Sequence, residues 1–137
     1  MRLIGLLGRA AALTAVAGLA PACSGDGETG PGQGKGKLTI EWTIDGSKDP
    51  AKCTEFGAVA LELIVFDAAG KFVTQAAPRC DAFTATLSLP EGAYDVNATL
   101  VGSTDEAASV TMPFAGVSVA HTETRKLTVS FPASTRI

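Results

Sequence analysis

Hydrophobic and polar residues alternate along much of this chain with a period of two. In the segment 38–45, Leu38, Ile40, Trp42 and Ile44 occupy every second position, with polar residues between them. Side chains two positions apart share one face of a β-strand, whereas an amphipathic helix repeats every 3.6 residues. The pattern predicts a strand that buries these four side chains, Trp42 among them, and exposes its other face.

Further segments with this tendency follow, and turn signals separate them. They are residues 59–66, 71–75, 83–89, 94–100, 109–112, 116–119 and 125–131. The turn signal at 67–70 predicts a hairpin between the first two of these segments, and Pro113 marks a sheet edge or a break. No segment shows helical periodicity. Residues 37–137 are therefore expected to be all-β, a single antiparallel sandwich of seven or eight strands.

The segment Leu89-Pro90-Glu91-Gly92-Ala93-Tyr94 resembles the Leu-Pro-x-Gly-x-Tyr turn of transthyretin-like and carboxypeptidase-regulatory-like modules. Residues 64–71 are similar to the strand-Asp-x-x-Gly hairpin of those modules. The likeness covers roughly residues 37–132 and implies a seven-stranded, prealbumin-like sandwich with a non-catalytic role. Independently of it, Gly92 permits a turn that other residues resist, and Tyr94 can bury its ring while its hydroxyl finds a partner.

The N-terminal segment has the three-part layout of an export signal. Arg2 and Arg9 supply early positive charge, and residues 10–20 form an uncharged apolar run. Such a run is too short to cross a bilayer, which takes about 20 apolar residues. Residues 1–22 are therefore expected to be a signal peptide.

The signal ends at Ala20-Pro21-Ala22-Cys23, which resembles the lipobox of bacterial lipoproteins. The resemblance implies that Cys23 is lipidated, begins the mature protein and anchors it in a membrane. Ser24 resembles the residue that sorts such proteins to the outer membrane, so the expected location is the bacterial outer membrane. The alternative is ordinary cleavage after Ala22, which leaves Cys23 as a free thiol.

Residues 23–36 are predicted to be the acylated Cys23 and a flexible tether. From residue 24 to residue 36 there are six glycines and no large apolar side chain, so the segment cannot bury enough surface to offset its ordering entropy. With Cys23 acylated, Cys53 and Cys80 are left as a pair. An oxidising compartment favours a disulfide between them, worth about 3 kcal/mol by loop entropy.

Residues suited to catalysis or metal binding are few. The single histidine, His121, lacks a nucleophile elbow such as Gly-x-Ser-x-Gly, so we expect a structural or solvated histidine and no enzyme activity. Asp45 and Asp49 lack the series of oxygen ligands in a calcium loop, which favours a solvated turn over an ion site. No metal or cofactor is predicted, and a formal net charge of −3 gives nothing basic to attract nucleic acid.

Strict alternation in the segment 59–66 turns Ile64 and Phe66 away from its buried side. If that face is exposed, the two residues form a small apolar patch that marks a partner surface; the alternative is burial under neighbouring loops. The predicted function is a non-catalytic, membrane-tethered interaction or structural module of the bacterial cell envelope, with an envelope protein or a glycan as partner. A lipoprotein that binds a small ligand, carbohydrate or peptide, is the alternative.

Overall fold

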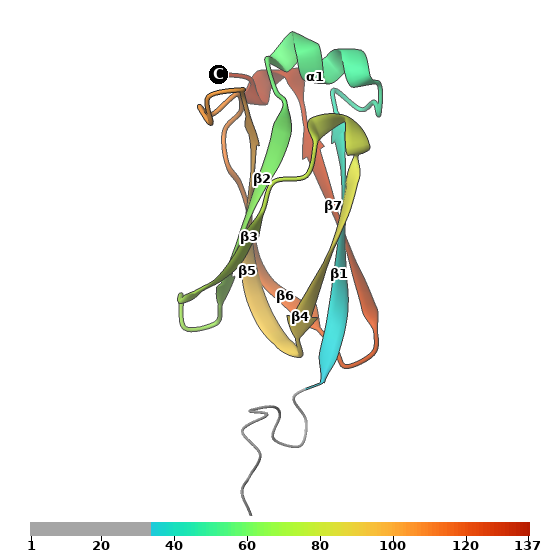
Figure 1. Cartoon of the computed structure of the whole chain (residues 1–137), viewed down its shortest axis with the longest axis vertical. Helices are drawn as coiled ribbons and strands as arrows, with labels where there is room; N and C mark the ends of the chain where they lie inside the picture. Colours follow the sequence, from blue (N-terminus) through green and yellow to red (C-terminus); the bar gives the residue numbers. More distant parts are fainter. Residues whose placement is uncertain (1–33) are drawn as a thin grey trace, which may run out of the picture.

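The computed structural model describes residues 34–137, which form a β-sandwich of seven strands (Figure 1). The predicted signal peptide, Cys23 and most of the predicted tether lie outside the described residues. In chain order the elements are β1 (Lys35–Ile44), α1 (Pro50–Phe56), β2 (Ala60–Asp67), β3 (Phe72–Ala76), η1 (Cys80–Ala82), β4 (Thr84–Pro90), β5 (Gly92–Val101), β6 (Met112–Val119), β7 (Thr124–Phe131) and η2 (Ala133–Thr135). Within residues 34–137 no helix is long and apolar enough to span a membrane.

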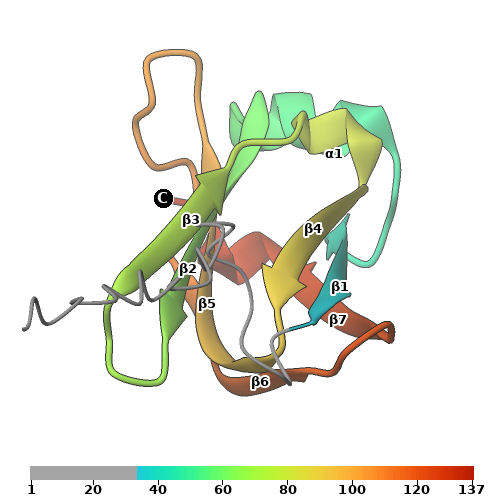
Figure 2. The ribbon, with the colours of Figure 1, turned by 60° about the horizontal axis from the view of Figure 1, so that its bottom comes forward.

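Two sheets form the layers of the sandwich (Figure 2). One has the strand order β4-β1-β7 and the other the order β3-β2-β5-β6. The expected all-β sandwich is confirmed, but the expectation of purely antiparallel pairing is wrong at β1 and β7, which run parallel. Alternation determines which face of a strand is buried and carries no information about strand direction. A parallel neighbour needs a crossover connection, and here the chain passes through the other sheet before β7 returns to lie beside β1.

The core consists of the inward side chains of both sheets. Trp42 is fully buried, as its place in the alternation predicts. Other fully buried side chains are Leu38, Ile40 and Ile44 of β1, Leu61, Leu63 and Val65 of β2, Val96 and Leu100 of β5, and Val129 and Phe131 of β7. Burial of a large apolar side chain is worth about 1.5–3 kcal/mol, so these rows hold the two sheets together.

Helix α1 is an element that the alternation did not predict, and it covers one end of the sandwich (Figure 1). Asp49 caps its first turn by accepting a hydrogen bond from the backbone N–H of Ala51 at 2.9 Å. Pro50 fits the first helical position, and Gly57 ends the helix in the left-handed conformation. Seven residues with two buried side chains are too few for a helical period to show in the sequence.

The predicted disulfide between Cys53 and Cys80 is confirmed. It joins α1 to η1 across a Cα–Cα distance of 6.0 Å, and both cysteines are buried. Disulfides persist in proteins that mature in oxidising compartments. The bridge therefore indicates an extracytoplasmic protein.

The Leu-Pro-x-Gly-x-Tyr segment forms the tight connection between β4 and β5. Gly92 has a φ of +156°, a conformation that L-residues rarely adopt. Tyr94 is 6% exposed, and its hydroxyl donates a hydrogen bond to the carbonyl of Pro90 at 2.5 Å. Both expectations for this motif are confirmed, and burial raises the pKa of the Tyr94 hydroxyl.

Strand β6 differs from the two short segments expected at 109–112 and 116–119. It is one strand that begins at Met112 and continues through Pro113, which is tolerated because β6 is an edge strand. Residues 109–111 belong to the loop before it.

The described part of the domain begins before the predicted boundary at residue 37, because β1 starts at Lys35. A β-carbon at Gly36 would lie 2.1 Å from the carbonyl oxygen of Ala120, and one at Gly34 would lie 1.4 Å from the ring of His121. Glycine at these positions therefore lets the start of β1 approach the turn between β6 and β7.

Replacement of Gly36 with alanine is expected to destabilise the domain by about 1–3 kcal/mol, the usual cost of overpacking. The added methyl group meets backbone at Ala120, which cannot rotate away. Gly34→Ala is the matched control, because its methyl group meets the exposed side chain of His121, which can turn. Urea unfolding should show the larger loss for Gly36→Ala, and equal midpoints for that variant and wild type would contradict the described contact.

Candidate functional site

The outer face of the three-stranded sheet is covered by hydroxyl and charged side chains. Its outward positions are Lys37, Thr39, Glu41 and Thr43 on β1, Thr84, Thr86 and Ser88 on β4, and Thr124, Lys126, Thr128 and Ser130 on β7. The hydroxyls of Thr39 and Thr86 lie 3.0 Å apart, and the Lys126 Nζ lies 2.9 Å from a Glu41 carboxylate oxygen. Such a face satisfies its polar groups among neighbours and with water.

The Lys126 ammonium lowers the pKa of Glu41 below its ordinary 4.5, mainly through its hydrogen bond, and its charge and that of Lys48 add to the effect. A carboxylate with a lowered folded-state pKa stabilises the fold fully above its unfolded-state pKa, and this contribution disappears as the pH falls through the folded-state pKa. An NMR titration should therefore show a low Glu41 midpoint that rises toward its ordinary value in Lys126→Met. An unchanged midpoint in that variant would show that Lys126 has no such effect.

The outer face of the four-stranded sheet has a different composition. Ile64 and Phe66 lie there half-buried, on the side of β2 opposite its buried leucines, as the alternation predicts. Phe72 of β3 is 53% exposed, and its ring centroid lies 6.4 Å from that of Phe66 with the rings nearly perpendicular. Aromatic pairs in this geometry stabilise each other. The predicted patch is thus a surface feature that includes a second aromatic ring.

Strand register extends the patch into two cross-strand rows. Phe66 lies opposite Phe72 on one side and Asp95 on the other. In the second row, Ile64 lies opposite Gln75 and Asn97, and Asn97 lies opposite Pro113. Residues directly opposite on adjacent strands have neighbouring side chains. The apolar patch therefore borders a carboxylate and an amide.

A groove of about 230 Å³, which we call the Phe66 groove, includes Phe66, Asp95, Asn97 and Pro113 of these rows in its lining. Its lining is Phe66, Gly70, Asp95, Asn97, Pro113, Phe114 and Ala115. An aromatic wall with a few polar groups is the usual composition of a ligand site. The volume is below the roughly 300–1,000 Å³ of pockets for drug-sized ligands, so the groove suits one small group rather than a whole cofactor.

The position of Asp95 is fixed by the backbone of β6. Between Tyr94 and Val96 the register with β6 shifts, and Asp95 accepts a hydrogen bond from the N–H of Gly116 at 3.1 Å. This irregularity occurs beside the groove, where shifts of this kind commonly re-aim side chains. The second carboxylate oxygen of Asp95 has no hydrogen bond within the described residues.

Both charged side chains at outward positions of this face are acidic. They are Glu62, opposite Thr99, and Asp95. The outward positions of β2 and β5 hold no lysine or arginine. Asp95 lines the groove itself, so an anionic ligand in the groove meets a like charge, while the exposed Lys71 lies in the hairpin between Gly70 and Phe72.

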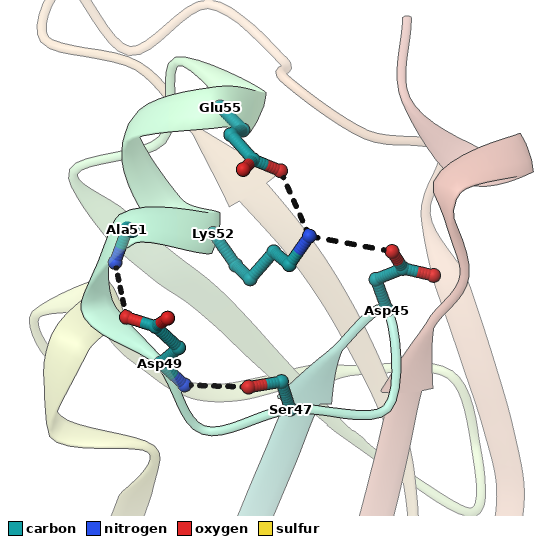
Figure 3. Close-up of polar contacts among 6 residues, drawn as sticks. All are labelled: Asp45, Ser47, Asp49, Ala51, Lys52 and Glu55. Atoms are coloured by element: carbon teal, nitrogen blue, oxygen red, sulfur yellow. Dashed lines mark hydrogen bonds and ion pairs between the residues drawn. The ribbon is translucent and has the colours of Figure 1, made fainter.

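The Asp45 and Asp49 carboxylates have separate structural roles (Figure 3). Asp49 caps α1, while Asp45 faces the ammonium of Lys52 at 3.5 Å. Lys52 also lies 3.1 Å from Glu55, and these partners raise its pKa. Across residues 34–137 no group of three or more His, Cys, Asp or Glu side chains is arranged to hold a metal ion. In this loop Asp49 therefore serves as a helix cap and Asp45 as an ion-pair partner.

The remaining candidate residues lie in loops. Glu106 accepts hydrogen bonds from the hydroxyl and the backbone N–H of Thr104, which lower its pKa. His121 is exposed in the turn between β6 and β7. A second cavity, of about 320 Å³, lies beside the disulfide, and the charges at its rim are paired, since Arg79 lies 2.8 Å from Asp81.

Comparison with known proteins finds similarity only at the level of distant structure. No protein-family model matches this chain, and no curated protein matches it. The Bacillus anthracis TIE protein matches 71% of this chain over 17% of its own, at 20% identity and a TM-score of 0.47. A leucine-rich repeat protein from Bacteroides thetaiotaomicron matches 72% of this chain over 12% of its own, at 14% identity and a TM-score of 0.46.

A third solved structure is a Bacteroides ovatus protein provisionally described as an adhesin. It matches 69% of this chain over 45% of its own, at 11% identity and a TM-score of 0.40. This chain spans less than half the length of each of the three proteins. These likenesses carry no argument about function.

Proposed function

We propose that this chain is an exported, non-catalytic binding module, anchored to the bacterial outer membrane by lipid on Cys23. Its binding surface is the outer face of the four-stranded sheet, and its partner is another component of the cell envelope. The observation that carries the proposal is the contrast between the two outer faces. The outer face of the three-stranded sheet is polar, and Lys126 and Glu41 form an ion pair on it. The outer face of the four-stranded sheet holds the exposed Phe72 and the Phe66 groove.

Export and anchoring are supported by two independent features. The N-terminal pattern resembles a lipoprotein signal that ends at Cys23, and the disulfide between Cys53 and Cys80 uses the other two cysteines. A lipid on Cys23 thus explains why an exported protein has an odd number of cysteines.

The non-catalytic role is supported by what the charged side chains contact. Asp49 caps a helix, and Lys52 is shared by two carboxylates. General acid-base or nucleophilic catalysis needs such groups to converge on a substrate position, and these groups are instead engaged in local structure.

Site-specific photocrosslinking in living cells tests the binding surface. A photoreactive residue at Ile64 should capture a discrete envelope component, because Ile64 is half-buried beside the groove. The same residue at Thr128, on the polar face, is the matched control and should capture none. Equal capture from both positions, or capture from Thr128 alone, would refute the assignment of this face.

Treatment of growing cells with globomycin, which blocks lipoprotein signal peptidase, tests the anchor separately. The precursor should accumulate, and a Cys23→Ala variant should lose membrane association. A mature chain that forms normally under the inhibitor would show that Cys23 is not lipidated.

A further inference from the structure

We infer that the Phe66 groove binds one sugar residue of a neutral polysaccharide. The inference rests on the proposed function, because it names the ligand class of the same face. It follows from the composition of the groove, its charge and its size.

The composition of the groove matches the surface of a sugar ring. A pyranose presents C–H groups on its faces and hydroxyl groups around its rim, so it is recognised by an aromatic side chain combined with hydrogen-bonding groups. Phe66 supplies the ring, and Asp95 and Asn97 supply the polar groups from the adjacent strand. A carboxylate accepts hydrogen bonds only, whereas an amide both donates and accepts. The hydroxyl groups of a sugar both donate and accept hydrogen bonds, so they can pair with the carboxylate and with the amide.

The charge of the face selects among saccharides. The charged side chain that lines the groove is Asp95, and Glu62 lies at another outward position of the same face; the exposed Lys71 belongs to the hairpin between Gly70 and Phe72. An anionic sugar would leave its charge beside Asp95, and like charges at close range repel. Neutral saccharides are therefore favoured over acidic ones.

The size and position of the groove favour a polymer over a free small molecule. At about 230 Å³ it holds one small group, and it lies on the outer face of a sheet. Gln75 and exposed Phe72 extend the same face across β3, so neighbouring sugars also meet polar and aromatic side chains.

A protein partner fits the face less well. A protein interface of standard size buries about 800 Å² on each side around an apolar, fully buried centre. Here Asp95 and Asn97, on the strand next to that of Phe66, interrupt the apolar patch. Desolvation of that carboxylate against an apolar partner surface would be costly, whereas sugar hydroxyls can replace its water.

The experiment uses the full-length lipoprotein in detergent micelles on an array of neutral and acidic saccharides. We expect binding to at least one neutral polysaccharide and none to polygalacturonate. Phe66→Ala and Asn97→Ala should each weaken that binding by about tenfold, the loss expected for one aromatic or hydrogen-bonding contact. Thr128→Ala, on the opposite face, should leave it unchanged.

Three outcomes would overturn the inference: no neutral saccharide bound, acidic saccharides bound instead, or neutral binding that survives both groove substitutions. Asn97→Ala keeps the test valid if Phe66→Ala does not fold, because Asn97 makes no side-chain hydrogen bond within the described residues. If saccharides fail to bind while crosslinking at Ile64 captures an envelope protein, the inference fails and the proposed function stands. If neither occurs, both fail.

Discussion

Replacement of Trp42 with alanine is expected to lower the free energy of unfolding by about 3–5 kcal/mol. Trp42 is fully buried, its indole N–H donates to the carbonyl of Cys80 at 2.9 Å, and its ring lies 6.3 Å from that of Phe83. A domain of this size has roughly 5–15 kcal/mol of stability in total, so the variant should be close to unfolding at physiological temperature. Urea unfolding is followed by circular dichroism, because the chain has one tryptophan and the substitution removes its fluorescence signal.

Phe72→Ala is the matched control, because Phe72 is 53% exposed and its truncation removes chiefly one aromatic pair, worth about 0.5–1.5 kcal/mol. Trp42→Phe is the intermediate variant, since it keeps a smaller aromatic ring and leaves the Cys80 carbonyl without its donor. That variant should lose about 1–3 kcal/mol. If Trp42→Ala and wild type had the same urea midpoint, the described core would be wrong.

Removal of the disulfide is the second large effect. A double Cys53→Ala and Cys80→Ala variant should lose about 2–4 kcal/mol, because the bridge closes a sequence separation of 27 residues and so restricts the unfolded chain. The expected result is a lower urea midpoint than wild type under oxidising conditions.

The same comparison under reducing conditions is the control. Wild type and the double variant should then unfold at similar urea concentrations, because neither has the bridge and they differ only in two buried thiol groups. Both cysteines are almost completely buried, so a reductant should act on the native protein far more slowly than on the protein in urea. A variant as stable as oxidised wild type would show that the bridge contributes nothing.

The buried half of the fold was predictable because burial in a sandwich depends on local alternation. Trp42 and Tyr94 were expected in the core and lie there, and the disulfide followed from the count of cysteines. The parallel pairing of β1 with β7 was not predictable, because it depends on the route of the chain between sheets. Helix α1 was missed because a helix of seven residues is stabilised by Asp49 and the disulfide rather than by a periodic face.

The candidate site was predictable on one strand only. Alternation placed Ile64 and Phe66 on the outer face of β2. Asp95 and Phe72 belong to neighbouring strands, and they reach Phe66 through cross-strand register, which a single sequence does not contain. Outward polar residues at alternate positions of the segment 94–100 were the available signal, but every half-buried strand shows such residues.

Hydroxyl-radical footprinting of the protein in its native envelope tests the binding face most directly. The oxidation of side chains is compared between intact cells and the purified full-length protein. Phe66 and Phe72 should be protected in cells, while exposed His121, in the turn between β6 and β7, should be oxidised equally in both samples. Equal oxidation of Phe66 and Phe72 in the two samples would show that nothing in the envelope covers this face, and the account would be wrong.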